Sequence, residues 1–272
     1  MRVIVHLSDI HFGRIEPATV AALTETIGRI QPDLLAVSGD LTQRARPTEF
    51  AQARRFLDAL PFHRLVVPGN HDVPLYNVFR RFLAPLDRYT DAITADLAPM
   101  YRDDEMIAVG VNTARSWTWG EGRINEAQAD AVAEQLWSAP ERLIRIVVTH
   151  HPFDLPEGVK GTRLLGRAAM AMEKLSRAGA DLFLAGHLHI SHIGHTAVRY
   201  NIAGHSALVV QAGTVSARSR GEQPSFNVLR IERPRISVER RVWDPERREF
   251  AATIASHFVH TDGGWLSADV TS

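Results

Sequence analysis

Five apolar runs in this chain each end in a short motif of polar residues. The runs are four to six residues long and rich in Val, Leu and Ile, as buried strands are. In α/β folds, ligands bind at the carboxyl ends of parallel strands, which lie at one edge of the sheet. We therefore expect the five motifs to converge in space. The motifs are Asp9-Ile10-His11, Gly39-Asp40, Gly69-Asn70-His71-Asp72, His150-His151-Pro152 and Gly186-His187-Leu188-His189.

Segments with helical spacing lie between the apolar runs. Apolar residues in segments 20–30, 50–60 and 165–175 step by three, four and three positions, which predicts one buried face per helix. Pro17 and Pro47 stand near the starts of the first two helices, where a missing amide hydrogen costs little. Strand and helix alternate up to about residue 185, so we expect mainly parallel pairing there. Beyond it we expect no helices, but a second sheet packed on the first. The strands expected in that sheet cover residues 192–203, 207–212, 226–232, 236–243 and 250–258.

The residue types in the motifs are those that hold divalent cations. Carboxylate and amide oxygens together with imidazole nitrogens suffice for two metal ions, and the combination predicts a two-metal hydrolase. A lone histidine near a strand end is more often an ordinary packed or surface residue. The order of all five motifs, each after an apolar run, favours the metal site.

Local geometry supports this interpretation. A carboxylate can bridge two cations roughly 3.5–4 Å apart, and Asp40 is suited to that role. His187 and His189 are two apart, so both can face the metals if the chain stays extended after Ala185. The glycines of the motifs permit tight turns and leave room beside the ions.

The motif set resembles the calcineurin-like metallophosphoesterase superfamily over residues 3–230. The Gly39-Asp40-Leu41-Thr42 and Gly69-Asn70-His71-Asp72 segments are similar to its bacterial class III cyclic-nucleotide phosphodiesterases. The resemblance implies an α/β/β/α fold, a two-sheet sandwich with helices on the outer faces. Of the adjacent His150 and His151, it selects His150 as a ligand. It implies one metal held by Asp9, His11, Asp40 and His189, and a second metal held by Asp40, Asn70, His150 and His187.

The same resemblance, with the chemistry of metal-activated water, suggests a mechanism. Two cations would lower the pKa of a shared water and present hydroxide in line with the phosphorus. His71 would protonate or stabilise the leaving oxygen, and Asp72 would orient the His71 imidazole. In the alternative interpretation, His71 and Asp72 only brace their turn.

Several other residues carry weaker signals. His6 lies within the first strand, where we expect packing rather than ligation. His151 is expected to support the ligands or face the substrate, and residues 152–162 to form a loop that shapes the pocket or merely connects. Trp117 and Trp119 could stack on a nucleobase or pack a corner, and we favour packing. A pocket-rim role and a structural role both stay open for His192, His195 and His205.

Composition limits the remaining choices. A chain of 272 residues with 45% hydrophobic content can bury a full core. Because the motifs must meet, we expect residues 1–272 to form one domain. The 31 basic and 31 acidic side chains cancel, so no global field favours nucleic acid as a partner.

The absence of cysteine limits the metals and the compartment. Ligands must be oxygen or nitrogen, which favours manganese, iron or zinc. No uncharged apolar stretch approaches the ~18 residues that a spanning helix needs. The first residues already form a strand rather than a secretory signal, so we expect a cytoplasmic enzyme.

Substrate choice is the widest open question. We favour a small phosphodiester, most of all a cyclic nucleotide. The alternatives are a glycerophosphodiester, a UDP-diacylglucosamine-type pyrophosphate and a phosphomonoester. A metal-free scaffold for protein interaction is an alternative of another class, but it would require lost ligands and none is missing. A homodimer is a further option.

Overall fold

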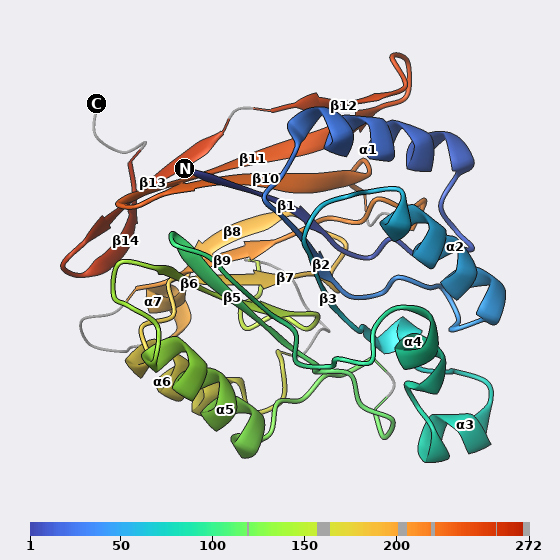
Figure 1. Cartoon of the computed structure of the whole chain (residues 1–272), viewed down its shortest axis with the longest axis horizontal. Coiled ribbons are helices and arrows are strands. Elements are labelled where there is room, and N and C mark those ends of the chain that lie inside the picture. Colours follow the sequence, from blue (N-terminus) through green and yellow to red (C-terminus); the bar gives the residue numbers. More distant parts are fainter. Residues whose placement is uncertain (119, 157–163, 201–205, 219–220, 254, 269–272) are drawn as a thin grey trace.

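The computed structural model describes residues 1–118, 120–156, 164–200, 206–218, 221–253 and 255–268. Two β-sheets pack face to face, and helices cover their outer faces (Figure 1). This is the expected α/β/β/α sandwich. None of the helices in these ranges combines the length and the apolar character that crossing a bilayer requires.

The first sheet has eight strands, in the order β14-β13-β11-β10-β1-β2-β3 with β12 paired to β11. Its parallel part is β1, β2 and β3, and its other pairings are antiparallel. The strands are β1 (Arg2–Leu7), β2 (Leu34–Ser38), β3 (Arg64–Val67), β10 (Ser225–Glu232), β11 (Arg235–Asp244), β12 (Glu249–Ala252), β13 (Ser256–Thr261) and β14 (Gly264–Ser267).

The second sheet has six strands, in the order β4-β5-β6-β7-β9-β8. Its centre, β5-β6-β7-β9, is parallel, and an antiparallel strand closes each edge. The strands are β4 (Met100–Arg102), β5 (Met106–Val111), β6 (Ile144–Thr149), β7 (Leu182–Ala185), β8 (His192–His195) and β9 (Leu208–Gln211).

Seven α-helices and one short 3₁₀ turn connect the described strands. The two expected amphipathic helices α1 and α2 begin at Pro17 and Pro47, as predicted, and lie on the first sheet. Helices α5 and α6 cover the second sheet. The helices are α1 (Pro17–Ile30), α2 (Pro47–Asp58), η1 (Asn70–Asp72), α3 (Val78–Leu83), α4 (Asp87–Ala92), α5 (Glu126–Trp137), α6 (Ala168–Arg177) and α7 (Thr196–Arg199).

Strand alternation explains how the layers hold together. Ile4 points into the core between the sheets, whereas its neighbour Val5 points into the core under the helices. The central core joins Leu34 of β2 to Ile146 of β6 and Leu184 of β7, all without solvent exposure. Each parallel strand is therefore apolar on both faces, which is why these segments read as continuous apolar runs.

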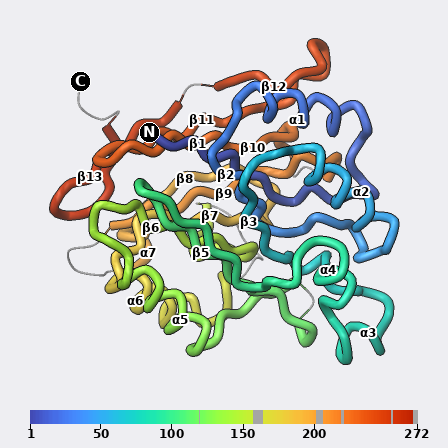
Figure 2. Tube along the Cα trace, in the orientation of Figure 1, coloured from blue at the N-terminus to red at the C-terminus, as the bar shows by residue number. Residues whose placement is uncertain are grey.

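The carboxyl-terminal strands differ from the expectation. They do not form a second sheet of their own, because β10 pairs antiparallel with β1 and extends the first sheet. β9 joins the parallel centre of the other sheet instead. Figure 2 shows the chain leaving the first sheet, building the second, and returning to the first in orange and red. The chain also forms helix α7 after residue 185, and two strands, β12 and β13, where one was expected.

Candidate metal centre

Five strand ends bring the predicted ligands to one place. The ends of β1, β2 and β3 supply the first three motifs from one sheet, and the ends of β6 and β7 supply the histidine motifs from the other. The site therefore lies where the carboxyl ends of both sheets meet. All the predicted donors contact one another there in two groups that share Asp40.

The first group contains Asp9, His11 and His189, which are all buried. The His189 Nε2 atom lies 3.1 Å from His11 Nε2 and 3.1 Å from Asp9 Oδ1. The Oδ2 atom of Asp9 accepts hydrogen bonds from the Ser8 hydroxyl and the His187 amide. Its Oδ1 atom is buried and receives no hydrogen bond from the described residues. One oxygen of the carboxylate is thus anchored and the other faces the histidines.

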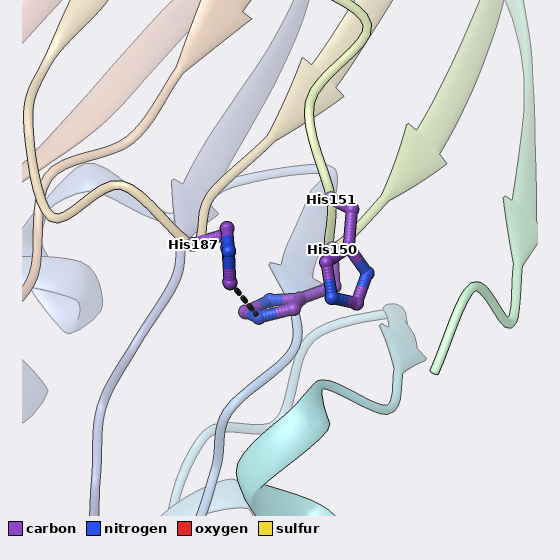
Figure 3. Close-up of side chains that lie close together, drawn as sticks. All are labelled: His150, His151 and His187. Atoms are coloured by element: carbon purple, nitrogen blue, oxygen red, sulfur yellow. Dashed lines mark hydrogen bonds between the residues drawn. The ribbon is translucent and has the colours of Figure 1, made fainter. Parts of the chain in front are cut away.

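The second group contains Asn70, His150 and His187. The Asn70 Oδ1 atom lies 3.0 Å from His150 Nε2 and 3.0 Å from His187 Nδ1. The two imidazoles contact each other over 3.3 Å between the same nitrogens. Figure 3 shows this contact at the ends of the neighbouring strands β6 and β7.

Asp40 lies between the two groups. Its Oδ2 atom is 3.8 Å from His11 Nε2 and 3.4 Å from His150 Nε2, while its Oδ1 atom accepts the His71 amide. Burial disfavours the charged carboxylate, yet His150 and His71 hold the pKa of Asp40 well below its usual range. An ionised Asp40 with one oxygen directed at both groups is placed to bridge two cations.

Main-chain carbonyls fix the orientation of three of the imidazoles. The Nδ1 atoms of His11, His150 and His189 lie 3.2, 2.8 and 2.7 Å from the carbonyl oxygens of Thr42, Ser38 and Arg218. Because a carbonyl only accepts, Nδ1 must carry the proton. The neutral form of each ring then presents an Nε2 lone pair to the site, as in metal-ligating histidines.

The donor set fits two divalent cations. Donors about 2.0–2.2 Å from one ion lie about 3–3.6 Å from each other, close to the spacing within both groups. The Nε2 lone pairs of two neutral rings in contact, such as His11 and His189, repel unless a proton or a metal ion lies between them. Burial lowers the pKa of His11 and of His187 to about 4, which keeps both rings in the neutral, ligating form. His150 differs because Asp40 outweighs burial and raises its pKa to about 9, so this position favours positive charge.

The backbone of the donors is unusual. Five of them, all outside the strands, have φ between 50 and 73°, a left-handed conformation that is rare for residues other than glycine. The expectation of an extended segment after Ala185 was therefore wrong, since His187 and His189 reach the site through a tight turn. Such conformations cluster at functional sites, where the surrounding structure enforces them. The five donors are Asp9, His11, Asp40, His187 and His189.

Asp72 does not have the predicted orienting role. Its carboxylate accepts hydrogen bonds from the Gly69 and Leu41 amides and from both the amide and the hydroxyl of Thr42. The His71 Nδ1 atom instead donates to the Gln43 carbonyl, 2.8 Å away. Asp72 therefore ties the turn after β3 to the turn after β2, which is the alternative considered above.

His71 lies beside the donors without belonging to either group. Its ring packs edge-on against that of His11, with centroids 4.9 Å apart. The His71 Nε2 atom lies 3.1 Å from Nη1 of Arg218, which can only donate. His71 thus accepts at the atom that would have to donate a proton to a leaving group.

His151 lies against the second donor group. It is buried, its ring packs on those of His150 and His187 with centroids 4.7 Å apart in both pairs, and its Nδ1 atom contacts the Thr113 hydroxyl at 2.8 Å. His6 contacts Ser38 and joins neither donor group, which agrees with the packing expected for it.

Three further candidates from the sequence contact residues other than the metal donors. His192 faces Asp154, and His195 packs on Phe258. Trp117 packs against Phe82 but is 82% exposed, so the prediction that it packs into a buried corner was wrong. His205, Trp119 and most of the expected 152–162 loop lie outside the described residues.

Arg218 was missed by sequence reasoning. It lies just after β9, in a segment without a metal-ligand pattern, and its contacts join residues far apart in the chain. No local signal marks it, since an arginine in a polar loop is most often a solvated side chain.

Comparisons with known proteins agree with this geometry. Residues 2–191 match the family model described as calcineurin-like phosphoesterase. A glycerophosphodiester phosphodiesterase, GpdQ of Enterobacter lignolyticus (strain SCF1), is 33% identical over 94 residues. That segment covers 30% of this chain and 33% of the relative, so the match spans only a third of the relative's length.

Similar solved structures include two phosphatases. A dimetal phosphatase from Danio rerio superposes with a TM-score of 0.65 at 14% identity, covering 92% of this chain and 98% of its own. A purple acid phosphatase from yellow lupin (Lupinus luteus) gives a TM-score of 0.69 at 11% identity, covering 94% of this chain and 53% of its own. At these identities the likeness concerns the fold.

Proposed function

The chain belongs to the calcineurin-like phosphoesterase family of metal-dependent phosphoric ester hydrolases, and from this we propose that it is a dinuclear phosphodiesterase acting on a small phosphodiester. The observation that carries the proposal is the pair of donor groups that share Asp40. Both sheets supply donors, which supports residues 1–272 acting as one domain.

We assign the donors by their contacts. The first ion would be held by Asp9, His11, Asp40 and His189. The second would be held by Asp40, Asn70, His150 and His187. When bound, such ions supply Lewis-acid stabilisation of phosphoryl oxygens and activation of a water molecule. Manganese, iron and zinc suit this oxygen and nitrogen set, in keeping with the predicted cofactors.

The chain's own residues complete the site. The main-chain amide of His71 holds Asp40 in place, and the His71 ring lies beside the first donor group. We keep His71 at the leaving oxygen, where it would act by holding the Arg218 guanidinium, whose charge would stabilise that oxygen. Asp72 supports catalysis by bracing the two turns that carry Asp40 and Asn70.

A cyclic nucleotide is our first choice of substrate. It rests on the likeness of the turns at 39–42 and 69–72 to those of class III cyclic-nucleotide phosphodiesterases. A glycerophosphodiester is the second candidate, and the relative named glycerophosphodiester phosphodiesterase favours it. A cytoplasmic location and a homodimer stay predictions of the sequence.

The test is metal analysis combined with a substrate panel. The purified protein, loaded with Mn²⁺, would be assayed on 3′,5′-cyclic AMP, glycerophosphoethanolamine, a sugar-nucleotide pyrophosphate and an aryl phosphomonoester. We expect two ions per chain and the highest kcat/KM on the cyclic nucleotide. Asp40→Ala should be inactive, and Asp58→Ala, a change at an exposed aspartate of α2, should be fully active.

Each contrary outcome selects an alternative. A higher kcat/KM on glycerophosphoethanolamine would replace the cyclic nucleotide with the second candidate. Preference for the pyrophosphate or the monoester would remove the phosphodiesterase proposal. Two tightly bound ions without hydrolysis of any member of the panel would favour a non-catalytic scaffold.

A further inference from the structure

Arg218 contacts the metal centre through both its main chain and its side chain. Its carbonyl oxygen accepts the Nδ1 proton of the donor His189 over 2.7 Å, and its guanidinium donates to His71 Nε2 over 3.1 Å. We propose that Arg218 is an anion-binding residue of this site, whose guanidinium contacts a phosphoryl oxygen of the substrate. The inference deepens the proposed phosphoester hydrolysis and rests on it.

A chain of buried hydroxyl groups holds Arg218 in position. The Thr214 hydroxyl donates to the Asp9 carbonyl over 2.7 Å and contacts the Ser216 hydroxyl at 2.8 Å. The Arg218 amide donates in turn to the Ser216 hydroxyl over 3.3 Å. Thr214 and Ser216 are each only 1% exposed. The loop after β9 is therefore fastened to the main chain of one donor, Asp9, and to the side chain of another, His189.

The guanidinium has an unusual partner. Some partly buried arginines of this fold pair with carboxylates, as Arg199 does with Asp154 and Arg240 with Glu222, and others donate to main-chain carbonyls, as Arg81 does to Ser116. Within the described ranges Arg218 instead donates to an imidazole nitrogen and forms no ion pair with a carboxylate. A guanidinium offers several donors in a fixed plane, which suits it to a phosphate. Its charge beside the donors is thus available to an anion.

His71 acts here as a positioning residue. The Gln43 carbonyl fixes its proton on Nδ1, so Nε2 can only accept from Arg218. Packing of the His71 ring against His11 places that contact at the first donor group. The Arg218 guanidinium is consequently held where a phosphate ester bound to that group would present its oxygens.

The two contacts of Arg218 can be tested independently, because one is made by its side chain and the other by its main chain. A side-chain substitution removes the guanidinium but leaves the main-chain carbonyl that orients His189. The measurement is the Kd of inorganic phosphate for the Mn²⁺-loaded protein, by titration calorimetry, together with metal content. Arg177→Ala serves as control, since it removes the same charge at a 72% exposed side chain of α6.

We expect Arg218→Ala to retain two ions and to raise the phosphate Kd about 10- to 100-fold, the range of a charge-assisted hydrogen bond. Arg218→Lys should recover part of the affinity. Arg218→Gln keeps a donor for His71 without the charge, and should bind phosphate as weakly as Arg218→Ala. His71→Ala should weaken phosphate binding less, and the double variant should bind no worse than Arg218→Ala alone.

Three results would overturn the inference. They are an unchanged phosphate Kd in Arg218→Ala and Arg218→Gln, loss of an ion in those variants, and a metal-loaded wild type that binds no phosphate. Failure of the proposed function looks different. A wild type that binds two ions and phosphate but hydrolyses no ester would contradict hydrolysis while leaving the role of Arg218 measurable.

Discussion

At the residue scale, the site depends on donors that fix their orientation with one polar atom and direct the other at the metal centre. Asp9 and Asp40 each anchor one oxygen in hydrogen bonds and direct the other at the histidines. His11 and His150 each place the Nδ1 proton on a carbonyl. These anchors fix the donor orientation before a metal binds, which reduces the ordering cost of binding.

Substitution of Asp40 should affect both ions, because its Oδ2 atom faces both donor groups. We expect Asp40→Ala to lose both metals at low-micromolar metal concentration, and His11→Ala to lose chiefly one. Metal content per chain after gel filtration measures this. His63→Ala, a change at an exposed histidine outside the site, is the control and should keep both ions. Two tightly held ions in Asp40→Ala would show that this residue does not bridge.

At the element scale, the turns after the strands position the metal donors. The turn after β3 packs against the turn after β2 so closely that a Cβ atom on Gly69 would lie 2.1 Å from Asp40 Oδ1 and 2.4 Å from the Asp40 amide nitrogen. The bonds of Asp72 hold the same two turns together. Any side chain at this glycine would force the turns apart.

Gly69→Ala should therefore impair metal binding and lower the free energy of unfolding by about 1–3 kcal/mol, as overpacking of a rigid contact does. Gly28→Ala in α1 is the matched control, since no atom lies within 4 Å of its added Cβ. That change should stabilise the helix by about 0.5–1 kcal/mol and leave metal content unaltered. Calorimetric unfolding and metal analysis test both. Equal metal content in the two variants would contradict the close packing of the turns.

At the scale of the whole molecule, the metal centre joins the two sheets. Asp9, Asp40 and Asn70 follow strands of the first sheet, whereas His150 and His187 follow strands of the second. The apolar core between the sheets holds them together elsewhere. Bound ions would therefore act as a cross-link at one end of the sandwich.

Removal of metal should lower the melting temperature. An ion present at 100 times its Kd stabilises the folded state by about 2.7 kcal/mol, which corresponds to a shift of about 5 °C for a chain of this size. Differential scanning calorimetry with and without chelator measures the shift, and added Mn²⁺ should reverse it. Asp40→Ala should show no response to chelator. A wild type with the same melting temperature in both conditions would argue against a cross-link between the sheets.

Much of the fold and of the donor set follows from the sequence alone, because the controlling interactions are local. Apolar runs specify the buried strands, three-four-three stepping specifies α1 and α2, and Pro17 and Pro47 mark their starts. The order of the polar motifs is likewise a local property. Since parallel strands must end at a common edge, the convergence of the motifs follows from that order.

Only the tertiary structure decided the remaining features, which depend on pairs distant in the chain. The pairing of β10 with β1 joins segments that local pattern cannot match. Arg218 contacts His71, which is 147 positions away in the sequence, and Asp72 accepts hydrogen bonds from Thr42 rather than from its neighbour His71. The left-handed turn at His187 and His189 is a conformation that local preference disfavours. The packing of one sheet against the other determines these features. The pattern of residues along the chain does not show which distant atoms that packing brings together.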